Sequence, residues 1–298
     1  MKKLTLNSYA KVNLFLNVKS KRPDNYHNLQ TVFERISLSD KIVLKNRPDG
    51  KIRIFCAAAG VPKDRSNLCY KAAAILRAEF AVKQGVDITI TKRIPVGGGL
   101  AGGSSNAACV LQGLNRLWDL KLGQKELAGF GRKIGADVAF FLHNTAFAFA
   151  TGRGDRIEEL KKLSKRKFWH VLVASDFKVS TPLIYRQWDK ALSTKKIPKP
   201  ALTTPARNVK ILTSALAEND LSLISQALYN SLEPVSSMLY PRINRVKQEL
   251  IRAGAKAVLM SGSGPTVFGL AATKKEALDL SRQLRRGKGR KIFIAATK

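Results

Sequence analysis

A glycine-rich stretch at residues 95–105 contains the residue types that bind anions. It reads Pro-Val-Gly-Gly-Gly-Leu-Ala-Gly-Gly-Ser-Ser, with five glycines and two serines in eleven residues. Glycine permits positive φ and lets a ligand come close to the main chain. A helix that begins after such a loop presents unpaired N–H groups and the positive end of its dipole, and both favour phosphate. The stretch therefore predicts a phosphate site.

The flanking residues indicate that this loop connects a strand to a helix. Residues 86–91 alternate between apolar and polar side chains, as in a half-buried strand. Residues 106–118 place apolar side chains at a spacing that fits one face of a helix. A flexible glycine linker is the alternative, but linkers are rarely flanked so closely by patterned elements.

Two common kinds of phosphate loop fit this sequence poorly. A P-loop ends in Gly-Lys-Ser/Thr, whereas Gly102 and Gly103 are followed by two serines. A dinucleotide fingerprint matches Gly97, Gly99 and Gly102, with Asp119 about 20 residues further on. However, Asp119 should end a second strand and instead lies between two helical patterns, which disfavours that interpretation.

Lys11, Asn13 and Asp137 are the side chains suited to phosphoryl transfer. Lys11 and Asn13 are two positions apart in a strand-like run, so they share one face. Asp137 lies among small and apolar residues, where a helix N-cap and a general base are both consistent with the pattern. A nearby ammonium group would keep this carboxylate ionised. Taken alone, Lys11 also fits a solvated position at a strand edge.

Two further motifs fit either packing or ligand contact. Tyr26 and His27 follow a turn at residues 22–25 and suit stacking on a nucleobase and hydrogen bonding to its edge, or simple packing. His27 has no partner at metal-ligand spacing. Residues 261–264 read Ser-Gly-Ser-Gly between two strand patterns, so they form a tight hairpin or shape part of a pocket.

Composition excludes several classes of protein. The chain has 298 residues, and 53 basic against 21 acidic residues give a formal net charge of +32. Such a charge suits nucleic acid, but there is no zinc pattern and no basic tail, and a positive field also recruits anionic substrates. No apolar run approaches the roughly 20 residues of a membrane span. Cys56, Cys69 and Cys109 are expected to be free thiols of a cytoplasmic protein.

Strand and helix patterns mix without strict alternation, which predicts an α+β fold. Near residue 155 the sequence pattern changes, because a charged stretch at 158–167 is followed by a new apolar run at 169–174. Domains are therefore expected at 1–155 and 156–298. A loop is expected at 193–205 and a helix C-cap at Gly254. Strands are expected at residues 4–18, 31–38, 41–44, 51–55, 86–91, 145–150, 169–174, 256–260, 266–270 and 291–295, and helices at 67–80, 106–118, 125–134, 209–217, 221–227, 242–253 and 274–285.

The loop at residues 95–105 resembles the phosphate loop of the GHMP kinases, whose pattern is Pro-x-x-x-Gly-Leu-Gly-Ser/Gly-Ser-Ser. Ala101 stands where many relatives have glycine. The remaining motifs follow the order of one branch of that family, over nearly the whole chain. These motifs are Lys11 with Asn13, Tyr26 with His27, Asp137, Ser180-Thr181-Pro182 and the turn at 261–264.

The resemblance implies a two-lobed α+β fold, with a ribosomal-protein-like N-terminal domain and a ferredoxin-like C-terminal domain. It implies Lys11 and Asp137 as the catalytic pair. It assigns substrate contacts to Asn13, Tyr26, His27 and Thr181. The residues that it assigns to ATP are Pro95, Val96, Gly97, Gly98, Gly99, Leu100, Ala101, Gly102, Gly103, Ser104 and Ser105.

This branch of the family implies transfer of phosphate from ATP to the 2-hydroxyl of a cytidine-diphosphate methylerythritol, in non-mevalonate isoprenoid synthesis. Mg2+ is expected with the ATP, and no tightly bound cofactor, specific nucleic acid or membrane is expected. The protein would be a monomer or a homodimer. Asn25 replaces the usual glycine before Tyr-His, and Asn106 replaces an aspartate of many relatives, which leaves Mg2+ to other groups.

Two other functions remain open at this point. Another GHMP kinase, for homoserine, mevalonate or a sugar, would have no cytosine for Tyr26 and His27 to recognise. A basic RNA-binding protein would not need Lys11, Asp137 and a phosphate loop together.

Overall fold

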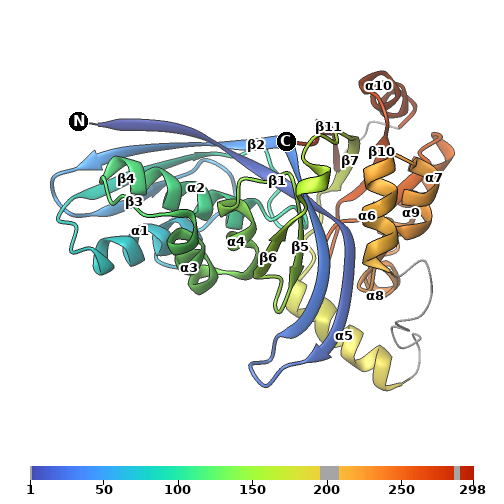
Figure 1. Cartoon of the computed structure of the whole chain (residues 1–298), viewed down its shortest axis with the longest axis horizontal. Coiled ribbons are helices and arrows are strands. Elements are labelled where there is room, and N and C mark those ends of the chain that lie inside the picture. The colour runs from blue at the N-terminus through green and yellow to red at the C-terminus, as the bar shows by residue number, and fades with distance from the viewer. Residues whose placement is uncertain (1, 195–207, 285–288) are drawn as a thin grey trace.

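The computed structural model describes residues 2–194, 208–284 and 289–298 (Figure 1). The expected loop at 193–205 therefore lies, from residue 195 on, outside the described residues. The first half of the chain forms β1 (Lys3–Lys21), β2 (His27–Arg47), β3 (Ile52–Phe55), α1 (Leu68–Glu79), β4 (Gly85–Thr91), α2 (Gly102–Leu117), α3 (Gln124–Ile134), α4 (Ala136–Leu142), β5 (Phe147–Thr151) and β6 (Arg156–Glu159).

The second half contributes a second sheet and its helices. Its elements are the short 3-10 helix η1 (Lys161–Leu163), β7 (Trp169–Ser175), α5 (Thr181–Ser193), α6 (Val209–Glu218), α7 (Leu221–Ala227), β8 (Tyr229–Asn230), α8 (Glu233–Leu239), α9 (Arg242–Arg252), β9 (Ala257–Met260), β10 (Val267–Ala271), α10 (Lys274–Gln283) and β11 (Arg290–Ala296).

The first sheet is built around the long antiparallel pair β1 and β2. Its strand order is β3-β4-β2-β1-β8, and β5 pairs with β2 and β6. The β1–β2 register shifts between Tyr9 and Ala10, which marks an irregularity just before Lys11. Helices α1 to α4 lie together on one side of these strands (Figure 1). The turn between β1 and β2 extends away from these helices toward α5.

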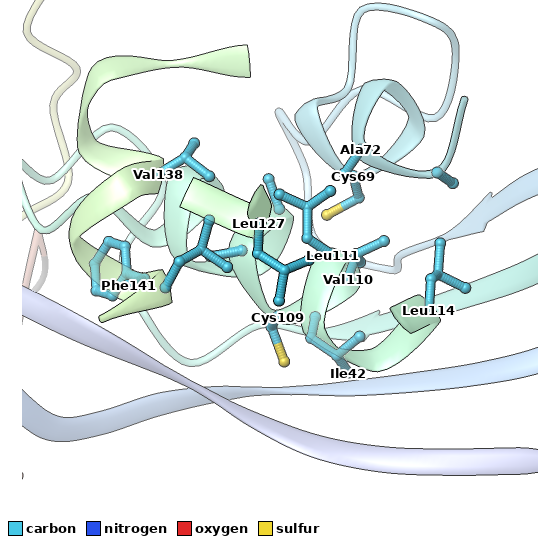
Figure 2. Close-up of a cluster of buried hydrophobic side chains, with 14 of the residues drawn as sticks. Ile42, Cys69, Ala72, Cys109, Val110, Leu111, Leu114, Leu127, Val138 and Phe141 are labelled. Atoms are coloured by element: carbon cyan, nitrogen blue, oxygen red, sulfur yellow. The ribbon is translucent and has the colours of Figure 1, made fainter. Parts of the chain in front are cut away.

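Helix α2 is the centre of the first hydrophobic core. Val110, Leu111 and Leu114 of α2 are fully buried and belong to one cluster with Ile42 of β2 and Ala72 of α1 (Figure 2). Burying each large aliphatic side chain contributes about 1.5–3 kcal/mol. This packing fixes the start of α2, and with it the glycine-rich loop, against the sheet.

The second sheet has the strand order β11-β7-β10-β9, all antiparallel. It shares a core with the first sheet, in which buried residues of β1 meet residues of β7, β10 and α6. Glu34 of β2 and His170 of β7 are fully buried, with 2.9 Å between Oε1 and Nε2. Thr297 Oγ1 donates to the same Glu34 oxygen at 2.6 Å. The two sheets are therefore joined by a polar contact as well as an apolar one.

The expected α+β class is confirmed, and most expected elements are present. The strands expected at 31–38 and 41–44 are one strand, β2, and the helix expected from residue 106 begins four residues earlier, at Gly102. The C-cap residue of α9 is Ala253, and Gly254, expected as the C-cap, is the next residue, with φ +92°. Helices α4, α5 and α8 and strands β6 and β8 were not expected.

The division of the chain at residue 155 stays a prediction. β6, at residues 156–159, and β8, at residues 229–230, both pair with strands of the first sheet. In the described part of the chain, none of the helices combines the length and the apolar character needed to cross a membrane.

Candidate active site

A cavity of about 480 Å³ lies where the two halves of the chain meet, and it gathers most of the expected site residues. β1 contributes Lys11 and Asn13, the glycine-rich loop contributes residues 95–103, and α4 contributes Asp137. α5 contributes Thr181 and Tyr185, and the Ser-Gly-Ser-Gly turn contributes Gly262 and Ser263. Segments far apart in the sequence therefore form one site.

Lys11 is held at the centre of this cavity by polar and aromatic contacts. Its Nζ donates to Asn13 Oδ1 at 2.6 Å and lies 3.5 Å from Asp137 Oδ2. The same nitrogen lies 4.7 Å from the centroid of the Phe33 ring. Lys11 and Asn13 thus share one face of β1, as their spacing predicts.

Burial and Asp137 act in opposite directions on the ammonium group. Lys11 is only 4% exposed. Burial lowers the pKa of Lys11 from its ordinary value of 10.5, while the negative charge of Asp137 and their hydrogen bond raise it in part. The pKa stays below the ordinary value because burial is the larger effect.

Asn13 is oriented by a short relay of hydrogen bonds. Its Nδ2 donates to Thr31 Oγ1 at 2.8 Å, and that hydroxyl donates to the carbonyl of Phe15 at 2.6 Å. The amide oxygen of Asn13 must then face Lys11. The relay therefore fixes which end of the amide faces the ammonium group.

Asp137 occupies the first turn of α4 rather than its N-cap. Gly135 is the N-cap residue, so the interpretation of Asp137 as a capping residue is wrong. Its side chain is 35% exposed, facing the cavity. The geometry leaves Asp137 accessible to a ligand and in contact with Lys11.

The glycine-rich loop uses left-handed backbone conformations to turn into α2. Gly97 and Gly99 have φ +71° and +74°, and Ala101, the N-cap residue, has φ +53°. α2 has no side-chain cap and no acidic residue in its first turn. Its first N–H groups are therefore available to an anion, as the sequence predicts.

Hydrogen bonds hold this loop against both β1 and the Ser-Gly-Ser-Gly turn. The Lys11 amide donates to the Leu100 carbonyl at 3.2 Å, and Ser261 Oγ donates to the Gly99 carbonyl at 3.0 Å. A Cβ on Gly99 would lie 2.3 Å from the Ser261 carbonyl oxygen. The turn at 261–264 therefore belongs to the hairpin between β9 and β10 and is also packed directly on the phosphate loop, so both interpretations of this motif are confirmed.

Ser104 and Ser105, the last residues expected to bind ATP, do not line this cavity. In the described part of the chain, the residues that line the cavity stop at Gly103 and resume at Asn106, so Ser104 and Ser105 are outside it. Ser105 Oγ is 2.7 Å from Ser8 Oγ of β1. These assignments to ATP stay predictions.

The sequence patterns did not identify Lys92, whose ammonium group lies beside the first residue of α2. Lys92 lines the cavity, its side chain is 8% exposed, and its Nζ pairs with the fully buried carboxylate of Asp40. Asp40 Oδ1 also accepts from the amides of Arg93 and Ile94 at 2.7 and 2.9 Å. A Cβ on Gly102 would lie 2.9 Å from Lys92 Nζ, so this ammonium group is adjacent to the phosphate loop.

Asn106 completes this buried network. Its Nδ2 donates to Asp40 Oδ2 at 2.9 Å and to Ser8 Oγ at 2.8 Å. Its Oδ1 is 3.5 Å from Lys92 Nζ. Both the nitrogen and the oxygen of the Asn106 amide have polar partners. The side chain therefore helps to hold α2 and Lys92 in place.

His27 and Tyr26 differ in their placement. His27 is 5% exposed, with 2.7 Å between its Nε2 and Asp189 Oδ1 of α5. Its ring lies 5.0 Å from the ring of Tyr185. Tyr26 is 56% exposed beneath the Arg153 guanidinium, and among the described lining residues neither Tyr26 nor His27 appears.

Tyr185 is a second residue that the sequence did not identify. It lines the cavity while stacking near His27, so it joins the His27 region to the Lys11–Asp137 pair. Burial raises the pKa of Tyr185 above its ordinary value, and the charge of Asp137 adds to this effect. The phenol therefore stays neutral at physiological pH.

Thr181 begins α5 and faces the cavity together with Ser263. Their hydroxyl oxygens are 2.8 Å apart. Ser180 accepts from the Leu183 amide and Pro182 follows at the first positions of the helix, which are ordinary helix-start signals. The expected substrate residue Thr181 is thus brought to the same cavity as Lys11.

The described residues hold no cluster of three or more His, Cys, Asp or Glu side chains suited to a metal ion. Cys56, Cys69 and Cys109 are free and buried, as expected. Burial raises the pKa of the Cys109 thiol to about 12, which makes it unreactive.

The chain matches known proteins in both halves and over its length. The family model described as GHMP kinases N terminal domain matches residues 67–145, and the one described as GHMP kinases C terminal matches residues 212–290. A 4-diphosphocytidyl-2-C-methyl-D-erythritol kinase of Bacillus velezensis is 43% identical over 276 residues, which is 93% of this chain and 91% of the relative. Another, of Gloeobacter violaceus, is 37% identical over 297 residues, covering 100% of this chain and 95% of the relative.

Solved structures agree with these matches. A crystal structure of 4-(cytidine 5'-diphospho)-2C-methyl-D-erythritol kinase superposes with a TM-score of 0.80 at 32% identity, covering 99% of this chain and all of that one. Homoserine kinase from Cytophaga hutchinsonii superposes with a TM-score of 0.76 at 21% identity, covering 100% of this chain and 95% of that one, which shows a shared fold. The resemblance predicted from the motifs is confirmed, and the chain belongs to the GHMP kinases, among the 4-diphosphocytidyl-2-C-methyl-D-erythritol kinases.

Proposed function

We propose that the chain transfers the γ-phosphoryl group of ATP to the 2-hydroxyl of 4-diphosphocytidyl-2-C-methyl-D-erythritol, in non-mevalonate isoprenoid biosynthesis. The products are the 2-phosphate and ADP. The observation that carries the proposal is the 3.5 Å contact between Lys11 and Asp137 in the cavity that the glycine-rich loop also lines. A base, a cation and a phosphate loop in one cavity are what phosphoryl transfer requires.

Asp137 accepts the proton of the attacking hydroxyl. Its carboxylate is exposed to the cavity and lies 3.5 Å from the ammonium nitrogen of Lys11. Lys11 orients Asp137 and the substrate oxygen and offsets the negative charge that develops during transfer. The hydrogen bond from Lys11 Nζ to Asn13 Oδ1 holds the ammonium group in place beside Asp137. The phosphoryl group moves directly to the hydroxyl, with no covalent phosphoenzyme.

The phosphates of ATP lie on residues 95–103, at the start of α2. The uncapped N–H groups of α2 donate to phosphate oxygens, and Lys92 supplies a positive charge beside Gly102. Apolar side chains of Val61, Pro62 and Leu68 line one part of the cavity and suit the adenine ring.

Mg2+ fits this site as part of the nucleotide. Mg2+ commonly keeps several waters and is held by one or two carboxylates together with substrate phosphates. Asp137 is the one carboxylate among the described lining residues, so it is the protein group that would hold the ion. When bound, Mg2+ supplies neutralisation of phosphate charge.

The cytidine end of the substrate lies toward α5 and the β1–β2 turn. Tyr185 offers a neutral aromatic face at the cavity, and His27 lies next to it, held by Asp189. Asn13, from β1, and Thr181, from α5, contact the sugar-alcohol part. Tyr26 is assigned to the same end because it precedes His27.

Some expectations about the whole protein belong to this proposal. The lobes are 1–155 and 156–298, and the protein is a monomer or homodimer in the cytoplasm, where ATP is supplied. It needs neither a tightly bound cofactor nor a specific nucleic acid.

Coupled ADP assays test the proposed reaction. The purified protein with ATP and Mg2+ should form ADP with 4-diphosphocytidyl-2-C-methyl-D-erythritol and not with homoserine. ADP formation with homoserine alone would overturn the substrate assignment. RNA binding without any ATP turnover would instead favour the RNA-binding alternative.

A further inference from the structure

A second cavity, of about 410 Å³, lies along one face of α2. Ser105, Cys109, Gln112 and Arg116 follow one another on this face at spacings of four, three and four residues. The other walls are Asn7, Ser8 and Tyr9 of β1, Arg35 of β2, and Phe141, His143 and Asn144 at the end of α4. Its volume is that of a pocket for a small ligand.

The lining of this cavity is cationic. It contains Arg35 and Arg116, and within the described part of the chain no aspartate or glutamate lines it. The neighbouring Glu159 does not line the cavity, and its Oε1 lies 2.9 Å from His143 Nδ1 at one edge. Lys298 adds a further cation, with Nζ 5.4 Å from the Tyr9 ring.

The remaining lining residues are mostly hydrogen-bonding groups over an apolar floor. Hydroxyl and amide side chains come from Ser8, Tyr9, Ser105, Gln112, Asn7 and Asn144. Cys109 and Phe141, both labelled in Figure 2, belong to the hydrophobic core beneath the cavity. Such walls bind phosphate by charge and by many donors at once.

Arg35 is a cation whose hydrogen-bonding capacity is only partly used. Its Nη2 donates to the carbonyl of His143 at 2.5 Å, and its guanidinium lies 5.5 Å from the Phe140 ring. Its Nε is buried and has no hydrogen-bond partner, and among the described residues Arg35 forms no ion pair. Burial lowers the pKa of Arg35 from its ordinary value, and nearby Tyr9 and Glu159 raise it in part.

We propose that this cavity is a second, separate binding site for the phosphate or diphosphate group of a small metabolite, with Arg35 and Arg116 as its cations. Two arginines without carboxylate partners favour phosphate because guanidinium groups bind its oxygens in pairs. The site is distinct from the ATP phosphate loop: of the residues at the start of α2, Ser105 faces the second cavity and Gly102 and Gly103 face the first.

Calorimetry with inorganic diphosphate tests this site on the full chain. The first cavity is saturated beforehand with a non-hydrolysable ATP analogue together with 4-diphosphocytidyl-2-C-methyl-D-erythritol, so that only the second cavity can take up the probe. We expect one diphosphate bound per chain. Inorganic phosphate, titrated in the same way, should bind more weakly because it has fewer charged oxygens.

Arginine variants locate the bound probe. Arg116→Gln, at an exposed position of α2, should weaken diphosphate binding at least tenfold, and Arg35→Gln should do the same if it folds. Both should keep the kcat and the KM for ATP within twofold of the parent values. The matched control is Arg132→Gln on α3, which removes the same charge at an exposed position outside both cavities.

Two results would overturn the proposal. One is the absence of diphosphate binding when the ATP cavity is filled. The other is an equal loss of affinity in Arg132→Gln and Arg116→Gln, since that would show attraction to the overall charge of +32 and not to this cavity. Ser8 and Ser105 are left unchanged because Ser8 also contacts Asn106 beside the ATP site.

Discussion

The ammonium nitrogen of Lys11 lies 3.5 Å from a carboxylate oxygen of Asp137, although one residue is on a central strand and the other begins a short helix. β1 fixes Lys11 through its register with β2, and the packing of α4 against α2 and α3 fixes Asp137. The proposed chemistry depends on both elements keeping their places.

Asp137→Asn tests the proton acceptor. An amide keeps the size and most hydrogen bonds of the carboxylate but cannot take up a proton, so kcat should fall by about 10²–10⁴-fold. The affinity for ATP, measured by calorimetry without Mg2+, should change little. Asp119→Asn removes the same charge from an 81% exposed side chain and should keep full activity. Normal turnover by Asp137→Asn would exclude Asp137 as the base.

The lowered pKa of Lys11 predicts the alkaline limit of activity. Because burial disfavours its charged form, Lys11 should lose its proton below the ordinary value of 10.5, and kcat/KM should fall over that range. In Asp137→Asn the stabilising charge is gone, so the fall in residual activity should move to still lower pH. If kcat/KM of the parent enzyme began to fall only at or above pH 10.5, the assignment of this fall to Lys11 would be contradicted.

The same shift has a consequence for stability. Between the lowered pKa and 10.5, folded Lys11 binds fewer protons than unfolded Lys11, so its contribution to the free energy of unfolding rises with pH. Lys11→Met lacks this contribution. Urea denaturation should therefore show the parent protein gaining stability relative to Lys11→Met as pH rises through this range.

Gly99→Ala should separate the phosphate loop from the Ser-Gly-Ser-Gly turn. Its φ is +74°, and the new Cβ would lie 2.3 Å from the Ser261 carbonyl oxygen. We expect a loss of about 1–3 kcal/mol in stability and a raised KM for ATP. Gly129→Ala in α3 is the control, where the nearest atom would be 3.9 Å away and helix propensity predicts a gain of about 0.5–1 kcal/mol. Equal melting temperatures of both variants would refute this account.

Lys92 and Asp40 allow phosphate binding to be separated from folding. Lys92→Met leaves the fully buried Asp40 carboxylate without its cation and should destabilise the fold by about 3–5 kcal/mol. The double variant Lys92→Met with Asp40→Asn should recover most of this stability. Both variants should have a KM for ATP raised about tenfold, from the loss of one phosphate contact to a charged group. A double variant with normal ATP affinity would remove Lys92 from the site.

Asp189→Asn tests the support of His27. The carboxylate is 2.7 Å from His27 Nε2 and fixes the orientation of the ring beside Tyr185. We expect a KM for the cytidine-bearing substrate raised about tenfold, as for the loss of one charge-assisted hydrogen bond, with the KM for ATP unchanged. Asp279→Asn, an exposed aspartate of α10, is the control. Equal changes in both KM values would indicate a general structural defect.

Local patterns predicted the parts of the site that are set by neighbouring residues. Two-residue spacing placed Lys11 and Asn13 on one face of β1, and the glycines at 97, 99 and 102 predicted the turn into a helix. The helix start at Gly102 was placed too late, since glycine is a weak helix former and only the packing of α2 makes it helical there.

The features that the sequence did not predict either depend on residues far away in the sequence or show no helical periodicity. Asp40 interrupts the apolar pattern of β2, and its burial is explained by Lys92, Asn106 and the amides of residues 93 and 94. α4 is apolar on nearly all sides, so it shows no helical period. α5 did carry a usable signal, since Ser180 and Pro182 mark its start and Ile184, Trp188 and Ala191 recur at helical spacing.

The contact of Glu34 with His170 and Thr297 bears on how the protein is made. A chain leaves the ribosome from its N-terminal end, so β2 emerges long before residues 170 and 297. Until then the Glu34 carboxylate lacks both partners that accompany its complete burial. The buried polar contact between the two sheets is therefore complete only after residue 297 has been made, and synthesis that stops earlier leaves the Glu34 carboxylate without Thr297.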